Sequence, residues 1–475
     1  MNTDPPTSYR TPPTKTPPWP HQKEAFWQAV TRDSHLLAIE MGAGKTLVAV
    51  MLHEAWEAKR TLVVCPKHVV GVWEREFLLH SFNPPNLYRL THATQAQKLK
   101  AAYRGWLTYS AHPTAFIINY DAVWRGGMGE WIMDRQWDLV ICDESHRIKG
   151  HKSKVSTFMA SLGKKAKKRL CLTGTPLYHS QLDIFGQARF LDPNLFGDSY
   201  HRFSLCYAKF FRMPIVTKRG HHTTTRVVCG FQNQEELQEK MKEFVYRPES
   251  IDKSKWPEFR HETFTCVLPA KARTLYDTLR TELVAEISSG VVTALNGLKA
   301  TMRLRQLVSG YLRADGELVL EIIHTAKADL LASVLTDIDS PVVVFAEFRH
   351  DLSEIRRIAK KLELRYGEVS GRASDLGPGS TYPEKIDVLG VQYQSGGSGV
   401  DFQNRCHRAI YYSPTWRLGD YKQSLRRIYR AGQKHNVVFT HLVCERTVDV
   451  VVTKALEKRG KIVDAVIDSL REEKG

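Results

Sequence analysis

A short glycine-rich turn links an apolar run to a stretch typical of a helix. The turn consists of Gly42, Ala43, Gly44, Lys45 and Thr46. Small residues let backbone N–H groups approach phosphates at a helix start, where Lys45 would add positive charge and Thr46 would hold magnesium. Ile39 replaces the first glycine of GxxxxGK[ST], so only the shorter Gly-x-Gly-Lys-Thr form is present. The turn predicts a nucleotide site, against the alternative of a turn that carries a lysine by chance.

Two adjacent carboxylates, Asp143 and Glu144, directly follow the apolar run that begins at Trp137. At the carboxyl end of a parallel strand, both would point into the crevice where α/β sheets bind ligands. Asp143 would hold magnesium, and Glu144 would orient and deprotonate an attacking water. One acidic pair alone is more often a surface feature. Its place after a strand, and after a phosphate loop in chain order, favours a catalytic role.

The elements that must position these residues form an α/β pattern. Short β-branched runs alternate with longer amphipathic stretches, which is typical of parallel sheets covered by helices. The first series of strand-like runs comprises residues 61–65, 115–119 and 137–142, and the second comprises 341–345, 386–391, 408–412 and 437–443. Two tandem α/β lobes are therefore predicted.

The predicted domains follow from this pattern. Residues 1–20 are rich in proline and threonine and are expected to be a disordered or extended leader. Residues 21–250 form the first lobe, with a small, mainly helical insertion at about 192–250, and residues 251–475 form the second. The insertion should contain a basic loop through Lys218, Arg219, His221, His222 and Arg226. Its paired histidines have no partner cluster, so a solvated loop is favoured over a metal site.

Composition limits the class of protein. The 475 residues carry a formal net charge of +17 and a pI near 9.4, which favours a polyanionic partner such as nucleic acid. The eight cysteines lack zinc or disulfide spacing and are expected to be reduced core residues of a cytoplasmic protein. No apolar stretch approaches the roughly 20 residues of a membrane helix, so no membrane partner is expected.

Several segments, in one order along the chain, carry a family resemblance. Asp143-Glu-Ser-His resembles the DEAH box of superfamily 2 helicases, and Leu172-Thr-Gly-Thr-Pro resembles their motif that couples ATP state to the nucleic-acid track. The segment from Cys65 to Phe77 is similar to one of the Swi/Snf family, as is Phe190-Leu-Asp-Pro-Asn-Leu-Phe. The resemblance runs from about Pro20 to about Thr447. It implies two RecA-like lobes with an ATP cleft between them.

The resemblance also implies roles for individual residues. Gln22 would contact the adenine base, and Thr173, Gly174 and Thr175 would form the coupling motif. The segment from Gln423 to Lys434 is similar to the last helicase motif, so Arg427 and Arg430 would reach the γ-phosphate. Gly399 and Asp401 would contact the nucleotide, although the family usually has asparagine at the position of Asp401. Arg426 is an extra arginine that is expected to face solvent or DNA.

The function implied is that of an ATP-dependent, Mg²⁺-requiring translocase on double-stranded DNA. Track contacts are expected to be sequence-independent and salt-sensitive. They are Lys67, His68 and Asn119 in the first lobe and Arg305, Ser395 and Gly396 in the second. The basic run from Lys164 to Arg169 is either a further contact or a solvated face. One chain supplies the whole ATP site, so a monomer suffices, and a protein partner is possible.

Three alternatives remain open. A strand-separating DNA or RNA helicase would share the same ATP site. A restriction-system or phage recombination motor would differ only in context, and the lack of bromodomain-like, chromodomain-like or nuclease segments favours a minimal bacterial or bacteriophage protein in a bacterial or phage-infected cytoplasm. A non-enzymatic nucleic-acid scaffold would be expected to have lost one of Lys45, Asp143, Glu144, Arg427 and Arg430.

Overall fold

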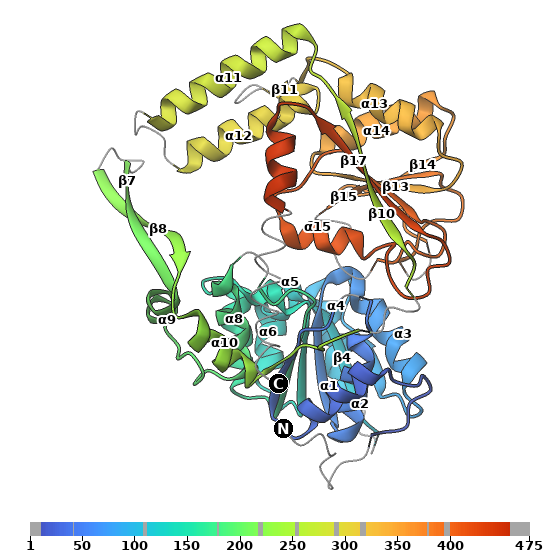
Figure 1. The fold of residues 1–475 in the computed structure, drawn as a ribbon. Coiled ribbons are helices and arrows are strands. Elements are labelled where there is room, and N and C mark those ends of the chain that lie inside the picture. Colours follow the sequence, from blue (N-terminus) through green and yellow to red (C-terminus); the bar gives the residue numbers. More distant parts are fainter. Residues whose placement is uncertain are drawn as a thin grey trace. The chain divides into compact units, whose positions relative to one another are not determined.

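The computed structural model describes residues 11–40, 42–107, 112–177, 180–216, 222–251, 256–288, 294–313, 320–377, 380–393 and 400–456. Contacts between Cα atoms divide the chain into two compact units. The first lobe contains the described chain up to Phe210 and Val228–Ser254, and the second contains Phe211–Val227 and the described chain from Lys255 onward. Each lobe holds one large sheet with helices packed against it (Figure 1). This confirms the predicted two-lobe α/β fold.

The sheet of the first lobe has seven strands, and every neighbouring pair is parallel. Its strands, in spatial order, are β3 (Asn86–Arg89), β4 (Thr114–Asn119), β2 (Arg60–Cys65), β5 (Leu139–Asp143), β6 (Lys168–Leu172), β1 (Ser34–Leu37) and β9 (Val245–Tyr246). The central strands are buried along their length, as their unbroken apolar sequences predict for a parallel sheet.

Helices cover both faces of this sheet. One face packs against α1 (Pro20–Val30), α2 (Lys45–Ala55) and α3 (Val70–His80). On the other face, Phe116 meets Trp106 of α4 (Gln95–Leu107) and Trp131 of α6 (Gly126–Met133). The remaining helices of this lobe's core are α5 (Tyr120–Val123), α7 (Lys154–Gly163) and α8 (Ile184–Leu191), with short 3-10 turns η1 (Lys67–Val69), η2 (Ser145–Ile148) and η3 (Gln181–Asp183).

The insertion differs in part from the helices and loop expected. It contains α9 (Tyr200–Tyr207), β7 (Ala208–Val216), β8 (His222–Phe231) and α10 (Gln234–Lys242), and β7 and β8 form a two-stranded sheet. The β-branched run at 223–228 favours such a strand. Lys218, Arg219 and His221 lie outside the described residues, and no group of three or more His, Cys, Asp or Glu side chains that could hold a metal occurs in the described part.

The sheet of the second lobe has six parallel strands. They are, in spatial order, β10 (Phe259–Cys266), β17 (Val437–Cys444), β16 (Arg408–Tyr411), β13 (Val342–Ala346), β15 (Val388–Gln392) and β14 (Tyr366–Val369). The predicted strand-like runs of this half therefore all lie in one sheet. The strand β10 is not among the strand-like runs predicted from the sequence, because an exposed, polar edge strand lacks their apolar pattern.

The helices of the second lobe bury an apolar stripe against this sheet. In α14 (Arg349–Lys361), Leu352, Ile355 and Ile358 recur at helical spacing and pack with α13 (Ala326–Thr336) on one face. The other described elements are α11 (Ala270–Ser288), α12 (Ala294–Val308), α15 (Leu418–Leu425) and the antiparallel strands β11 (Tyr311–Arg313) and β12 (Leu320–Ile322).

Part of the leader, which the sequence predicts to be disordered or extended, is attached to the first lobe as extended chain. Thr14 bridges to Ser81 at the end of α3, and the Lys15 N–H donates to the His80 carbonyl at 2.9 Å. Proline cannot donate a backbone hydrogen bond, but the residues between the prolines can, which explains this extended attachment.

The cysteines of this chain are unpaired thiols in the structure. All eight cysteines are free thiols, and five of them are buried. Among the described residues, no helix is both long enough and apolar enough to cross a membrane.

A buried carboxylate ties α14 to the end of β16. The Ser413 hydroxyl donates to Asp351 Oδ2 at 2.6 Å, and the Phe348 N–H donates to the same oxygen at 3.3 Å. Asp351 is fully buried, and this burial raises its pKa from 3.8 to about 6, although the Ser413 hydrogen bond and the Lys327 charge oppose the shift. The ionised carboxylate is therefore less favourable in the folded state than in the unfolded state.

We expect Asp351→Asn to gain stability relative to wild type as the pH rises from 4 to 7.5. A folded pKa above the unfolded value gives a contribution that is fully present below pH 3.8 and lost as the pH rises through about 6. At roughly 1.4 kcal/mol per pKa unit, the change amounts to about 3 kcal/mol. Thermal unfolding midpoints of both proteins at the two pH values measure it.

Asp387→Asn is the matched control for this prediction. The Arg365 hydrogen bond lowers the pKa of Asp387, so its contribution is lost as the pH falls and that variant should change in the opposite direction. A difference between Asp351→Asn and wild type that does not vary with pH would contradict the prediction.

Candidate nucleotide and coupling site

The parallel register brings five strand ends of the first lobe to one edge of the sheet. Cys65 pairs with Asn119, while Leu172 pairs with both Asp143 and Leu37. The phosphate loop, the acid pair, the coupling motif and two of the expected track residues all follow these ends. The carboxyl edge of a parallel sheet is where α/β proteins bind ligands, so this arrangement brings the predicted residues of the first lobe together.

The predicted phosphate loop has the backbone that its glycines allow. Gly42 and Gly44 have φ angles of +82° and +77°, and Gly44 is the N-cap of α2. The left-handed φ favours glycine at this position, and a Cβ at Gly44 would lie 2.0 Å from Gln22 Nε2 and would displace that amide. Lys45 is the first residue of α2 and is 9% exposed, which places its charge at the helix start.

Gln22 contacts the phosphate loop directly. Its Nε2 donates to the carbonyls of Ala43 and Gly44, both at 3.2 Å, and its Oε1 accepts from the Trp19 N–H at 2.7 Å. Pro20 at the start of α1 fixes this helix entrance, since its missing N–H is not needed there. The residue that was assigned to the adenine base therefore also holds the loop for the phosphates.

Asp143 is buried and held by two donors. Trp73 Nε1 donates to Oδ2 and the Glu144 N–H donates to Oδ1, both at 2.9 Å. Burial is the largest cause that raises the pKa of Asp143 to about 6, and the Glu144 charge adds to it, whereas the Lys45 charge and the Trp73 hydrogen bond lower it. A buried pair of carboxylates of this kind would be stabilised by a divalent cation, and its oxygen ligands suit magnesium.

Glu144 begins a chain of polar contacts that leads to the coupling motif. Its φ of +52° is unusual for a residue with a side chain, and its carboxylate lies 3.3 Å from His146 Nδ1. The same His146 nitrogen lies 3.3 Å from Thr173 Oγ1, which in turn accepts the Thr175 N–H at 3.1 Å. The acid pair and the coupling motif are thus connected within the first lobe.

Trp73, Tyr120 and His146 have site contacts to which the sequence analysis gave no role. The Tyr120 hydroxyl donates to the Asp143 carbonyl at 2.7 Å, and Trp73 holds the carboxylate of the same residue. Trp73 and His146 stand inside segments that carry the family resemblance. Their position in these segments and their polar ring atoms are the features of the sequence that could have indicated a role.

The expected track residues differ in how they are presented. Lys67 is exposed in η1, and Asn119 is 8% exposed at the end of β4. Arg305 is buried instead, with its guanidinium donating to the Pro414 carbonyl and lying 5.1 Å from the Phe348 ring. Arg305 therefore packs inside the second lobe in this structure, and its contact with a track stays a prediction. Ser395, Gly396 and the side chain of His68 lie outside the described residues.

The two predicted arginines of the second lobe both contact the segment around Asp401. Arg427 is 2% exposed, and its Nη1 donates to the Val400 carbonyl at 2.9 Å, while its own carbonyl accepts the Phe402 N–H at 3.0 Å. Arg430 Nη1 lies 3.4 Å from Asp401 Oδ2. The structure therefore brings Asp401, Arg427 and Arg430 together, while Gly399 lies outside the described residues.

Arg426 packs over two aromatic rings of its own lobe. Its guanidinium carbon lies 4.9 Å from the centre of the Trp256 ring and 5.3 Å from that of Tyr429. A guanidinium over aromatic faces is held by the ring quadrupole. That Arg426 faces solvent or DNA stays a prediction.

The basic run is locally neutralised as well. Lys164 pairs with Asp198 at 3.4 Å, and Lys167 and Lys168 pair with Asp138 and Asp33, both at 2.8 Å. These contacts favour the interpretation of the run as a solvated face.

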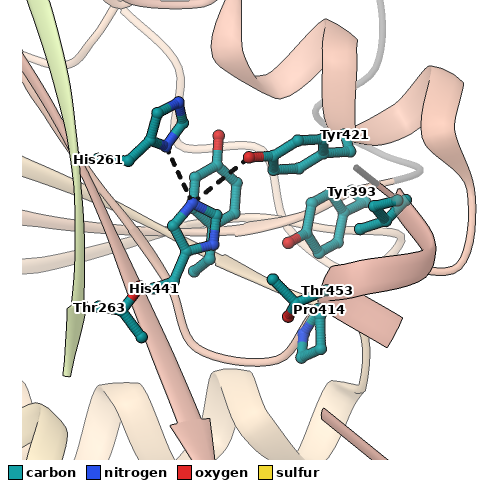
Figure 2. Close-up of a pocket in the computed structure, with 9 residues that line it drawn as sticks. His261, Thr263, Tyr393, Pro414, Tyr421, His441 and Thr453 are labelled. Carbon is teal, nitrogen blue, oxygen red and sulfur yellow. Dashed lines mark hydrogen bonds between the residues drawn. The ribbon is translucent and has the colours of Figure 1, made fainter. Parts of the chain in front are cut away.

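A cavity of about 270 Å³ lies within the second lobe, apart from the residues discussed above. Figure 2 shows His441 at its centre, with Nε2 lying 3.2 Å from His261 Nδ1 and 3.4 Å from the Tyr421 hydroxyl. Burial lowers the pKa of His441 to about 3, which keeps the ring neutral. The cavity is lined by His261, Thr263, Tyr393, Tyr411, Pro414, Tyr421, His441, Thr453 and Leu456. None of the predicted site residues is among them.

More than half of this chain matches one known protein family. Residues 21–310, more than half of the chain, match the family described as the SNF2-related domain. The chain belongs to the SNF2-related domain family. This membership confirms the Swi/Snf resemblance and agrees with the two α/β lobes.

Relatives of this SNF2-related chain come from phages, bacteria and eukaryotes. Protein p41 of Acyrthosiphon pisum secondary endosymbiont phage 1 is 27% identical, over 92% of this chain and 96% of that protein. YqhH of Bacillus subtilis (strain 168), named an ATP-dependent helicase, is 24% identical over 95% and 80%. The DNA repair and recombination protein RAD54 of Oryza sativa subsp. japonica is 23% identical over 87% of this chain, which spans only 47% of that protein.

Solved structures similar to this SNF2-related chain include the SWI2/SNF2 ATPase core of Sulfolobus solfataricus in complex with dsDNA. The two are 21% identical, with 97% of this chain and 95% of that chain covered and a TM-score of 0.44.

We expect Trp73→Phe to reduce ATP turnover at limiting magnesium by about 10- to 100-fold, as for other residues that orient a metal ligand. Phenylalanine keeps most of the buried ring but cannot donate to Asp143. Steady-state hydrolysis across a magnesium titration measures the effect, which should appear mainly as a higher magnesium concentration for half-maximal hydrolysis. Trp137→Phe is the control, because Trp137 is equally buried and donates only to the Ile132 carbonyl. Equal losses in both variants would mean that Trp73 only packs.

Proposed function

We propose that this chain is an ATP-dependent motor that translocates on double-stranded DNA. The observation that carries the proposal is the shared strand edge of the first lobe, where a glycine loop, Lys45 and the buried Asp143 and Glu144 lie at neighbouring strand ends. Membership of the SNF2-related domain family supports the same conclusion. The chain is accordingly a nucleic-acid-stimulated ATPase.

In the proposed site, each residue has a chemical role. The loop Gly42–Thr46 cradles the phosphates with its backbone N–H groups, and Lys45 neutralises their charge. Thr46 and Asp143 hold Mg²⁺, which supplies charge stabilisation at the transferred phosphoryl group when bound. Glu144 orients and deprotonates the attacking water. Gln22 contacts the adenine base.

The second lobe completes the proposed cycle. Arg427 and Arg430 supply positive charge to the γ-phosphate, and Gly399 and Asp401 contact the nucleotide. The motif Thr173–Thr175 couples the nucleotide state of the site to contact with the nucleic acid. Since phosphoryl transfer needs mainly positioning and charge neutralisation, arginines that arrive from another lobe make hydrolysis depend on conformation.

The proposed partner is duplex DNA, bound without sequence preference through Lys67, His68, Asn119, Arg305, Ser395 and Gly396. The net charge of +17 supports a polyanionic partner. The RAD54 relatives are named DNA repair and recombination proteins, which favours DNA over RNA. The phage relative, which matches over nearly its whole length, supports a bacterial or bacteriophage motor. In this proposal the motor works in the cytoplasm of a bacterium or phage-infected host, and a monomer suffices for the ATP site.

The first test is steady-state ATP hydrolysis with no nucleic acid, duplex DNA, single-stranded DNA or RNA. We expect the largest stimulation with duplex DNA. Lys45→Ala should abolish hydrolysis under all four conditions, because the charge on the phosphates is removed. Rising salt should reduce the stimulation, since phosphate contacts release counterions.

The other outcomes of this test separate the alternatives. Stimulation chiefly by single-stranded DNA or RNA would favour a strand-separating helicase, the function for which YqhH is named. Absence of hydrolysis under every condition would contradict the motor and favour a nucleic-acid scaffold.

A second prediction concerns Glu144→Gln. This variant should bind ATP and DNA as wild type does but lose turnover, because the amide preserves the shape of the side chain and removes the base. Binding of a fluorescent ATP analogue and single-turnover hydrolysis measure the two properties separately. Normal turnover in this variant would show that Glu144 is not the base.

A further inference from the structure

The helix α8 approaches the segment after the acid pair unusually closely. A Cβ at Gly186 would lie 2.0 Å from the Ile148 carbonyl oxygen, so only glycine allows the helix to pass this backbone. The next residue, Gln187, is completely buried. The close approach therefore brings the Gln187 side chain between η2, which begins directly after Glu144, and the loop that follows β6.

Both ends of the Gln187 amide are used, one on each segment. Its Oε1 accepts the Ser145 hydroxyl at 2.7 Å. Its Nε2 donates to the Pro176 carbonyl at 2.8 Å, and also to the carbonyl of Asp183, the N-cap of its own helix, at 3.3 Å. Ser145 is the neighbour of Glu144, and Pro176 is the neighbour of Thr175, so the amide spans the two motifs.

The chemistry of the partners fixes the orientation of this amide. A carbonyl can only accept, so Pro176 requires the NH₂ end of Gln187, and the remaining oxygen faces the Ser145 hydroxyl. Ser145 and Gln187 are both 0% exposed, so no water is available to replace either contact at the surface. A buried polar group that loses its partner is costly, so the two bonds restrain the distance between the segments.

We propose that Gln187 is a positioning residue that transmits the state of the acid pair to the coupling motif. The inference deepens the proposed function and rests on it. It is distinct from the contacts of His146 with Glu144 and Thr173, because it uses α8 and the backbone of Pro176. Two connections between the same segments make their movements interdependent, whereas a single hydrogen bond would leave a hinge.

The test compares Gln187→Met, Gln187→Glu and Ser145→Ala with wild type. Methionine keeps the length and volume but removes both hydrogen bonds. Glutamate keeps an acceptor for Ser145 but places an oxygen against the Pro176 carbonyl. Ser145→Ala removes only the hydrogen bond between residue 145 and Gln187. For Gln187→Met we expect duplex DNA to stimulate ATP hydrolysis at least about 5-fold less than in wild type, a typical coupling magnitude, with unstimulated hydrolysis and nucleotide affinity nearly unchanged.

Hydrogen–deuterium exchange provides a readout that does not depend on DNA. A nucleotide analogue should protect the backbone of residues 172–177 in wild type, and this protection should be lost in Gln187→Met although the analogue still binds. If wild type itself is not stimulated by any nucleic acid, the proposed function fails, and the exchange measurement still decides the role of Gln187.

Thr61→Val is the matched control. Thr61 is also 0% exposed in the first lobe and shares a buried hydrogen bond of 2.9 Å with His53, away from the coupling motif. It should lower the unfolding midpoint without changing the stimulation factor or the exchange pattern. Wild-type stimulation and protection in Gln187→Met, or equal losses in Thr61→Val, would overturn the proposal.

Discussion

Two adjacent carboxylates buried at the end of β5 are the constraint on which the first lobe depends. Keeping a carboxylate ionised in this buried place costs free energy, and the raised pKa of Asp143 reflects that cost. Burial is its main cause, and the charge of the neighbouring Glu144 increases it. The surrounding residues reduce this cost: Lys45 provides a positive charge and Trp73 a hydrogen bond. Parallel register is what brings these groups to one place, because strands far apart in sequence end in the same row. A divalent cation would lower this cost, which agrees with the metal–nucleotide ligand proposed for the site.

The same strand edge also explains how a change at the site could spread. The chain of contacts through His146 and the amide of Gln187 both end on the loop after β6. In the second lobe, Arg427 is bonded to both sides of the segment around Asp401. In each lobe, hydrogen bonds thus connect the predicted site residues to a second predicted motif. Packed networks of this type move between discrete arrangements more readily than they deform gradually.

The sequence was sufficient for the parts of the fold that local pattern controls. The apolar strands of both sheets, the phosphate loop and the position of the acid pair were predicted, because buried parallel strands have unbroken apolar sequences. The strand β10 and the two-stranded sheet of the insertion were missed, since exposed or polar strands lack that signal. Gln187 was missed for a different reason. A glutamine in a helix is ordinarily a surface residue, and only the tertiary approach at Gly186 reveals that it is buried between two motifs.

The partners of the basic side chains likewise depend on tertiary contacts that a local stretch of sequence does not contain. The run from Lys164 to Arg169 was the most conspicuous basic segment, yet Lys164, Lys167 and Lys168 are paired with nearby carboxylates. Arg305 and Arg426 lie against carbonyl and aromatic groups of the second lobe. Linear clustering of basic residues is therefore a poor guide to which cations are left without a nearby carboxylate. The net charge of +17 still acts at long range, because partially paired cations contribute to the overall field even where they make no contact. Long-range attraction to a polyanion and direct contact with its backbone are thus separate properties, and the proposed direct contacts of the first lobe lie at the strand-end loops.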